Sequence, residues 1–223
     1  MSWGYLGKVP NRGDFLTHNV SGPLRELMFE WLQAALAVSR EQLGEAWLDA
    51  YMTAPIWHFA ASPGVLDEQG VAGTLIPSVD RVGRHFPFVV LGDSGGALLD
   101  AWRQPDWASS VEDCILAVLD DTWQEDAWRQ RLDSIPLPEA EPVRLQLPGG
   151  EGNLALPAGV AEADWLRALL ENHPERMIWW TQGSAYVEPV TLLTEGLPKV
   201  GQFAAMLAGQ WQTRGWRQGA LVE

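Results

Sequence analysis

Two short loops concentrate the side chains whose types and spacing suit binding or catalysis. One loop holds Asp80, Arg81 and Arg84, and the other, close to the start of the chain, holds Arg12 and Asp14. Each loop lies between two apolar runs and contains a glycine, which frees the backbone for a tight turn. Loops that carry such charged residues are common sites of function, so these five residues are our candidate site residues.

The two arginines of the later loop allow two interpretations. Arg81 and Arg84 lie three residues apart around a glycine, so their guanidiniums can converge on a phosphate or a carboxylate. The same arginines can instead pair with Asp14 and Asp80 and fasten the loop to the N-terminal turn. We favour the structural fastening and keep open a site for an anion or a protein partner.

No catalytic constellation is evident beside these loops. Residues 92–96 spell Gly-Asp-Ser-Gly-Gly, the nucleophile loop of chymotrypsin-like proteases, but the helical residues 22–51 lie where that fold needs a β-barrel. We therefore expect a glycine-rich turn there. The alternative function is a small hydrolase or anion-binding enzyme that uses the arginines with one of four residues, Ser78, Asp80, His85 or Ser94.

Cofactor and metal sites are not predicted. The four histidines, at positions 18, 58, 85 and 173, show no metal-ligand spacing, and the chain has a single cysteine, Cys114, in an apolar run. No glycine-rich phosphate-binding loop occurs in the sequence. We expect no cofactor, no metal and a buried Cys114.

The composition narrows the classes of partner. The chain has 223 residues, 47% of them hydrophobic, and a formal net charge of −14, which disfavours nucleic acid and anionic membranes as partners. No apolar stretch is long enough to span a membrane, and no export signal is evident, so we expect a cytoplasmic protein. Of its 13 tryptophans, four in polar surroundings are candidates for an exposed binding surface: Trp102, Trp107, Trp211 and Trp216.

Hydrophobic periodicity predicts alternating helices and strands. Apolar residues three and four apart predict a helix from Pro23 to about Arg40, and a second, acidic helix over 107–131. Further helices are expected at residues 45–52, 97–103, 161–172 and 199–211, and strands at 3–7, 56–61, 71–76, 86–91, 143–147, 177–181 and 186–192.

This pattern predicts an α/β fold, a three-layer α/β/α sandwich with a mixed, partly antiparallel central sheet. The proline-rich residues 135–142 are the best candidate for a linker. Because the residues beyond it are few for an independent core, we predict a single domain over 1–223, in which 143–223 completes the fold.

The candidate loops also carry a family resemblance. Residues 4–15 read Gly-Tyr-x-Gly-Lys-x-Pro-x-Arg-Gly-Asp-Phe, and residues 77–87 read Pro-Ser-x-Asp-x-x-Gly-Arg-x-Phe-Pro. Together with the tryptophan-containing runs at 29–32, 47–51 and 55–59, these motifs resemble the TagF family, also called ImpM, of type VI secretion-associated proteins. The resemblance is best over about residues 1–93.

The resemblance implies a non-catalytic, cytoplasmic accessory protein of a bacterial type VI secretion system. TagF-like proteins are expected to act as post-translational repressors, beside the threonine phosphorylation pathway, by binding the forkhead-associated (Fha) scaffold protein. The binding surface would include Arg12, Asp14, Asp80, Arg81 and Arg84, or alternatively the acidic helix predicted over 107–131.

Overall fold

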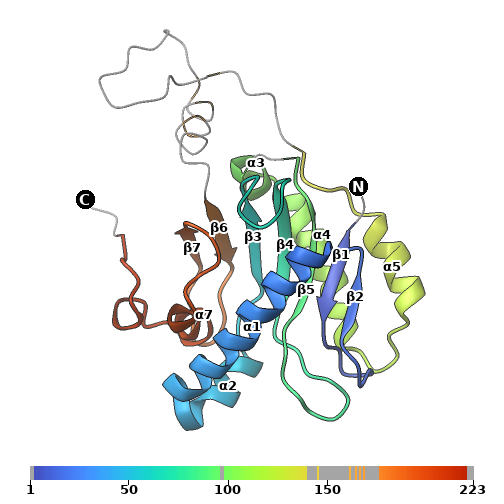
Figure 1. Ribbon diagram of the computed structural model, residues 1–223, viewed down its shortest axis with the longest axis vertical. Helices are drawn as coiled ribbons and strands as arrows, with labels where there is room; N and C mark the ends of the chain where they lie inside the picture. Colours follow the sequence, from blue (N-terminus) through green and yellow to red (C-terminus); the bar gives the residue numbers. More distant parts are fainter. Residues whose placement is uncertain are drawn as a thin grey trace.

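One antiparallel sheet forms the centre of the molecule (Figure 1). The computed structural model describes residues 3–95, 98–139 and 176–219, together with five isolated positions between residues 139 and 176. Within these residues seven strands pair in the order β2-β1-β5-β4-β3-β6-β7. Their bounds are β1 Gly4–Gly7, β2 Leu16–His18, β3 Trp57–Ala61, β4 Val71–Ile76, β5 Phe88–Asp93, β6 Met177–Thr181 and β7 Val190–Thr194.

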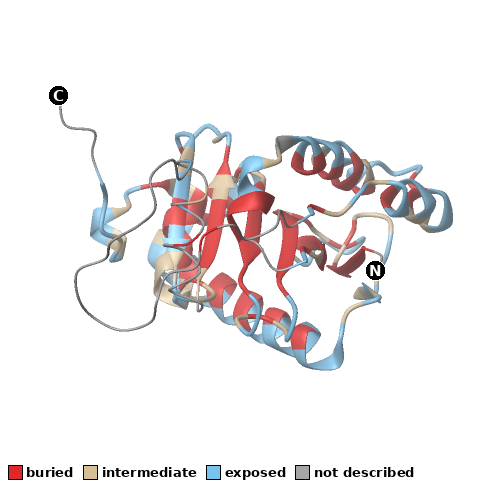
Figure 2. Cartoon of the chain, turned by 90° about the horizontal axis from the view of Figure 1, so that it is seen from above, coloured by how far each residue is buried: buried red, intermediate tan, exposed pale blue. Residues whose placement is uncertain are grey.

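Helices pack on both faces of this sheet, which appears as a buried layer in Figure 2. One face is covered by α1 (Gly22–Leu43), α2 (Trp47–Met52) and α7 (Phe203–Ala208). The other face is covered by α3 (Leu98–Arg103), α4 (Pro105–Leu116) and α5 (Glu125–Asp133). The described residues also form four 3-10 turns, η1 to η4, at Gly44–Ala46, Ala117–Leu119, Val200–Gln202 and Gln212–Arg214.

The helix α1 shows how the sequence specifies an element. The Ser21 hydroxyl accepts a hydrogen bond from the Leu24 amide, 3.4 Å away, and Pro23 occupies the first turn, where its missing N–H has no cost. Six apolar residues at three- and four-residue spacing are buried against the sheet: Leu24, Met28, Trp31, Leu32, Ala35 and Leu36. The helix stops at Gly44, whose φ of 55° suits glycine. The predicted helix is therefore confirmed.

Alternation along the strands divides the interior into two cores. In β5, Val89 and Leu91 pack towards α1, whereas Phe88 and Val90 pack towards α4 and α5. Because successive strand residues point to opposite faces, a strand that is covered on both sides is mostly apolar on both of its faces. This explains why the central strands are continuous hydrophobic runs in the sequence.

The α/β class is confirmed, but the mixed character predicted for the sheet is wrong. All six strand pairs of the described residues are antiparallel, including the pairing of β3 with the late strand β6. The connection from β4 to β5 is a loop without a crossover helix, as antiparallel neighbours require. Strand β2, which the sequence pattern did not reveal, extends the sheet beyond β1.

The long helix predicted over 107–131 is also wrong, because the chain turns at Asp120. The Asp120 carboxylate accepts hydrogen bonds from the Thr122 amide at 2.7 Å and from the Thr122 hydroxyl at 2.6 Å. Such a side-chain bond to the backbone competes with helix formation. The segment therefore forms two helices, α4 and α5, joined by η2 and this turn.

Two C-terminal elements differ in extent from the predictions. Strand β7 occupies 190–194 rather than 186–192, and the helix predicted over 199–211 ends at Ala208, where Gly209 has a φ of 67°. The strand predicted at 143–147 and the helix predicted at 161–172 fall on stretches that lie outside the described residues, apart from isolated positions.

Cys114 is fully buried in the core beneath α4, as predicted. Burial raises the pKa of its thiol to about 11, so the reactive thiolate is scarce at neutral pH. We expect a thiol reagent such as dithionitrobenzoate to leave the native protein unlabelled at pH 8 for hours. The same reagent should label one thiol at once in guanidinium chloride. Rapid labelling of the native protein would contradict this burial.

Candidate functional site

The loop that holds three of the candidate residues is a small hairpin between β4 and β5. We call residues 78–86 the Asp80 hairpin. Its ends are joined by a hydrogen bond from the Phe86 amide to the Ser78 carbonyl, 3.0 Å long, and by a bridge between Val79 and His85. The tip turns at Gly83, whose φ of 84° lies in the left-handed region. The hairpin therefore has a defined backbone, not an open loop.

The Asp80 carboxylate holds the tip of this hairpin together. Its Oδ1 accepts hydrogen bonds from the Val82 and Arg84 amides at 3.0 and 2.9 Å. Its Oδ2 accepts from Arg84 Nε at 2.6 Å and from Lys8 Nζ at 2.9 Å. The Asp80 side chain is fully buried, and these four hydrogen bonds saturate both of its carboxylate oxygens.

The environment keeps Asp80 ionised. Burial alone would raise the pKa of its carboxyl group, but the hydrogen bonds from Lys8, Arg84 and Val82 together hold that pKa well below its usual range. A carboxylate with so low a pKa is a weak base, and near neutral pH it carries no proton to donate as an acid. The observed contacts give Asp80 a structural role in the hairpin.

Three contacts join the hairpin to the N-terminal turn. The Arg84 Nη2 donates to the Gly13 carbonyl at 2.7 Å, the Arg81 amide donates to the Arg12 carbonyl at 2.9 Å, and Lys8 reaches Asp80. Lys8 was not among the predicted site residues. The available signal was that it is the only charged residue before Arg12 in the sequence.

The predicted site residues divide into two groups. Asp80 and Arg84 form an ion pair inside the hairpin. The side chains of Asp14 and Arg81 are exposed and have no hydrogen-bond or ion-pair partner within the described part of the chain, while the Arg12 guanidinium lies 5.8 Å from the centre of the Trp123 ring. The structure thus brings all five into one region but pairs only two of them.

The base of the hairpin rests on α2. The Tyr51 hydroxyl donates to the Ser78 carbonyl at 2.8 Å and accepts from the Ser78 amide at 3.0 Å. The His85 ring lies edge-on to Trp47 and Tyr51, and burial and the nearby Arg40 charge lower its pKa. These contacts fix the position of the hairpin on the body of the protein.

The hydrolase interpretation finds no catalytic pairing in this region. The buried hydroxyl groups of Ser78 and Ser94 have no hydrogen-bond partner among the described residues, so neither is joined to a histidine. Ser94 instead closes the end of β5, where its amide donates to the Gly70 carbonyl at 2.9 Å. The described residues also contain no cluster of three metal-ligating side chains.

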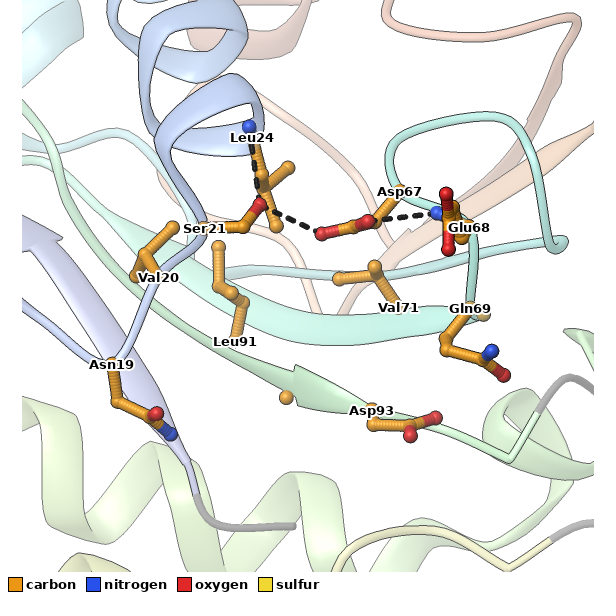
Figure 3. Close-up of a pocket in the computed structure, with 12 residues that line it drawn as sticks. Asn19, Val20, Ser21, Leu24, Asp67, Glu68, Gln69, Val71, Leu91 and Asp93 are labelled. Carbon is orange, nitrogen blue, oxygen red and sulfur yellow. Dashed lines mark hydrogen bonds between the residues drawn. The ribbon is translucent and has the colours of Figure 1, made fainter.

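A pocket of about 330 Å³ lies between the start of α1, the residues before β4 and the end of β5 at Asp93 (Figure 3). Asp67, Glu68 and Asp93 contribute its acidic groups, and the Ser21 hydroxyl donates to Asp67 at 2.8 Å. Its lining contains neither histidine nor lysine.

His58 is the most deeply buried of the histidines that the structure describes. Its Nδ1 lies 2.9 Å from the Thr74 hydroxyl and its Nε2 lies 3.2 Å from Glu112 Oε2. Burial lowers the pKa of His58 to about 4, so the ring is neutral at neutral pH. In the neutral ring, Nε2 carries the proton and donates a hydrogen bond to Glu112. Nδ1 accepts a hydrogen bond from the Thr74 hydroxyl.

The low pKa of His58 predicts an acid-dependent loss of stability. As the pH is lowered from 6.5 to 4, His58 becomes protonated in the unfolded chain but stays neutral in the folded protein. The free energy of unfolding therefore decreases as the pH is lowered across this window, by about 3 kcal/mol at most. The variant His58→Gln should show a shallower dependence. Urea unfolding at pH 7, 6, 5 and 4.5 measures both, and parallel curves would contradict the assignment.

Comparisons with known proteins extend the resemblance seen in the sequence. Residues 4–135 match the family model described as the TagF N-terminal domain, type VI secretion system-associated. The crystal structure of PA0076 from Pseudomonas aeruginosa PAO1 is similar, with 31% sequence identity and a TM-score of 0.78 over 100% of this chain and 97% of that chain. No curated protein matches the sequence.

The described helices include none that is long and apolar enough to cross a membrane. The family match covers more than half of the chain and includes both loops of the Asp80 region. The chain therefore belongs to the TagF family of type VI secretion system-associated proteins.

Proposed function

We propose that this protein is a non-catalytic, cytoplasmic repressor of type VI secretion that acts after translation by binding the forkhead-associated scaffold protein. Membership of the TagF family supports an accessory role in type VI secretion. The proposed contact surface is the tip of the Asp80 hairpin together with Arg12 and Asp14. By occupying the scaffold, the repressor would keep it from assembling the secretion apparatus.

The observation that carries this proposal is a rigid hairpin tip with an exposed apolar residue. Val82 is 68% exposed, the largest exposed fraction among the bulky hydrophobic residues of the described chain. It stands between Arg81 and Arg84, and the Arg84 side chain remains 62% exposed despite its pairing with Asp80. Arginines and an apolar anchor are typical of protein interfaces, and a preformed loop loses little conformational entropy on binding.

The saturation of Asp80 also supports a non-catalytic role. A hydrolase or anion-binding enzyme centred on this loop needs a carboxylate or histidine free to transfer protons. Asp80 is held ionised by Lys8 and Arg84, and His85 is packed against α2. The charges of Asp80 and Arg84 stabilise the conformation of the hairpin. The exposed side chains of Arg81 and Val82 remain available to contact a partner.

The proposal is tested by calorimetric titration of the purified protein into the forkhead-associated scaffold of the same secretion cluster, phosphorylated and unphosphorylated. The double variant Arg81→Glu/Val82→Asp should weaken binding at least tenfold, since both side chains project from the tip. Its melting temperature should stay close to that of the wild type because neither side chain is a buried partner.

Arg103→Glu provides the matched control. Arg103 is exposed on α3, which follows β5, whereas the Asp80 hairpin precedes β5, so the two lie at opposite ends of the strand (Figure 1). This variant should bind as the wild type does. Equal weakening by both variants would remove the hairpin from the interface, and failure to bind either form of the scaffold would overturn the mechanism.

A further inference from the structure

A second hollow of about 510 Å³ lies on the face of the sheet that α3 and α4 cover. Residues of α3 and α4 form part of its wall. The rest comes from strands β3, β6 and β7 and from residues next to these strands in the chain. None of its residues belongs to the Asp80 hairpin or to the N-terminal turn. The residues on which the argument depends are His58, Trp102, Ser109, Glu112, Trp180 and Gln182.

Glu112 places a negative charge in the wall of this hollow. His58 donates to Glu112 Oε2 across 3.2 Å and is itself held by Thr74, so the carboxylate has a fixed orientation. Because His58 is neutral, it orients the carboxylate without neutralising it. No lysine or arginine is paired with Glu112 within the described residues, and burial and the Asp113 charge raise its pKa, as expected for an acid that lacks a cation.

Two tryptophans give the same hollow its aromatic surface. Trp180 is held in place by ring contacts to His58, with centroids 5.5 Å apart, and to Trp107, at 5.9 Å. Trp102 of α3 is 38% exposed, which is unusual for so large an apolar side chain. Of the four tryptophans predicted to be exposed, Trp102 is the one that is: Trp107 is buried, and Trp211 and Trp216 are half-buried.

A carboxylate beside tryptophan rings is suited to an organic cation. The face of an indole ring attracts ammonium and guanidinium groups, and a carboxylate that is partly shielded from water binds them by charge-assisted hydrogen bonds. The Ser109 hydroxyl and the Gln182 amide oxygen provide further acceptors along the wall. An anion would meet the Glu112 charge, and a purely apolar ligand would leave that charge without a partner.

We propose that this hollow binds an alkylammonium or guanidinium group, with Glu112 as the counter-charge and Trp102 and Trp180 as the aromatic walls. The cation can belong to a free small amine or to a lysine or arginine side chain of a protein. This site is separate from the Asp80 hairpin and goes beyond the proposed repressor function, so that either can fail without the other.

The test is titration of the full-length protein with Nα-acetyl-L-arginine amide, followed by calorimetry and by the indole N–H signals in nitrogen-15 spectra. We expect a dissociation constant of about 1 mM or tighter, with shifts confined to a few indole signals. Replacing Trp102 and Trp180 by phenylalanine, one at a time, identifies their signals. The neutral isostere Nα-acetyl-L-citrulline amide should bind at least tenfold more weakly.

Glu112→Gln and Asp113→Asn form a matched pair of variants. Both remove one negative charge from neighbouring positions of α4, but Asp113 is exposed and does not line the hollow. Glu112→Gln should weaken arginine amide binding at least tenfold, whereas Asp113→Asn should change it less than twofold. Trp102→Leu, on an exposed side chain, should weaken binding about threefold or more without loss of folding.

Two further ligands distinguish the sources of the cation. Agmatine represents a free amine, and a capped Gly-Arg-Gly peptide represents a protein side chain. Binding of agmatine alone assigns the site to a small molecule, binding of the peptide assigns it to a protein partner, and both results support a cation site. Any of three results would overturn the proposal. Citrulline amide could bind as tightly as arginine amide, or Glu112→Gln and Asp113→Asn could have equal effects. The third result is that no cation binds at about 20 mM, a concentration roughly 20-fold above the expected dissociation constant.

Discussion

The variant Asp80→Asn is expected to lower the free energy of unfolding by about 3 kcal/mol and the melting temperature by roughly 6–12 °C. In one orientation the asparagine oxygen accepts from the Val82 and Arg84 amides, and its NH₂ group faces Lys8 Nζ and Arg84 Nε. In the flipped orientation the NH₂ group faces the two backbone amides instead. In either orientation two donors lose their acceptor on the buried Asp80 side chain. Thermal and urea unfolding followed by circular dichroism measure the loss.

Two other variants show whether this loss comes from burial. Asp14→Asn, at an exposed carboxylate in the same region, should change the free energy of unfolding by less than about 0.5 kcal/mol. Lys8→Met should be destabilising, because it leaves the buried Asp80 charge with one cation fewer. If Asp80→Asn proves as mild as Asp14→Asn, the carboxylate does not hold the hairpin.

The pH dependence of these variants has a defined sign. The pKa of Asp80 is depressed in the folded state, so its contribution to stability is complete above the ordinary aspartate pKa of about 4 and is lost as the pH falls through the folded value. The difference in free energy of unfolding between wild type and Asp80→Asn should therefore be constant from pH 7 to 5. It should shrink below about pH 4.

A fragment that ends at residue 135, the limit of the family match, is expected to lose cooperative folding. The Trp31 indole donates to the Pro198 carbonyl at 2.7 Å, and the Trp57 indole donates to the Met206 carbonyl at 3.1 Å. Phe203, Met206 and Trp179 also fill the core beneath α1. Without them, the fragment exposes a large apolar surface and two buried donors lose their acceptors.

A chain that ends at residue 219 is the control, because it keeps every element of the described structure. Near-ultraviolet circular dichroism and proton–nitrogen spectra should show fixed tertiary structure in the control and none in the fragment. The prediction of a single domain over 1–223 depends on this result. Cooperative unfolding of the 1–135 fragment would show instead that the family-matched region is an independent domain.

The elements that were predicted correctly are those whose local sequence is enough to determine them. Helix α1 was predictable because its apolar residues repeat with the helical period between Pro23 and Gly44, and β3, β4 and β5 because short apolar runs are bounded by turn residues. The break between α4 and α5 was missed. It depends on the Asp120 side chain, whose preference for a turn does not disturb the hydrophobic period.

The candidate site was predictable only in part, for a similar reason. Asp80 and Arg84 lie four residues apart, so their pairing could be anticipated, whereas Lys8 is 72 residues from Asp80 and meets it only through the pairing of β1 with β5. His58 and Glu112 are 54 residues apart on different elements. Partners of this kind require a correct strand order, which the predicted mixed sheet did not supply.

The strand order has a consequence for how the chain is made. Strand β3 ends at Ala61, but its outer neighbour β6 begins only at Met177, so during synthesis the ribosome completes β1 to β5 long before β3 has a second partner. Through that interval the edge of β3 presents unpaired backbone groups from the residues that later pair with β6, among them Phe59 and Ala61. Such an edge invites pairing with another chain, so we expect the nascent protein to aggregate more readily than the completed one.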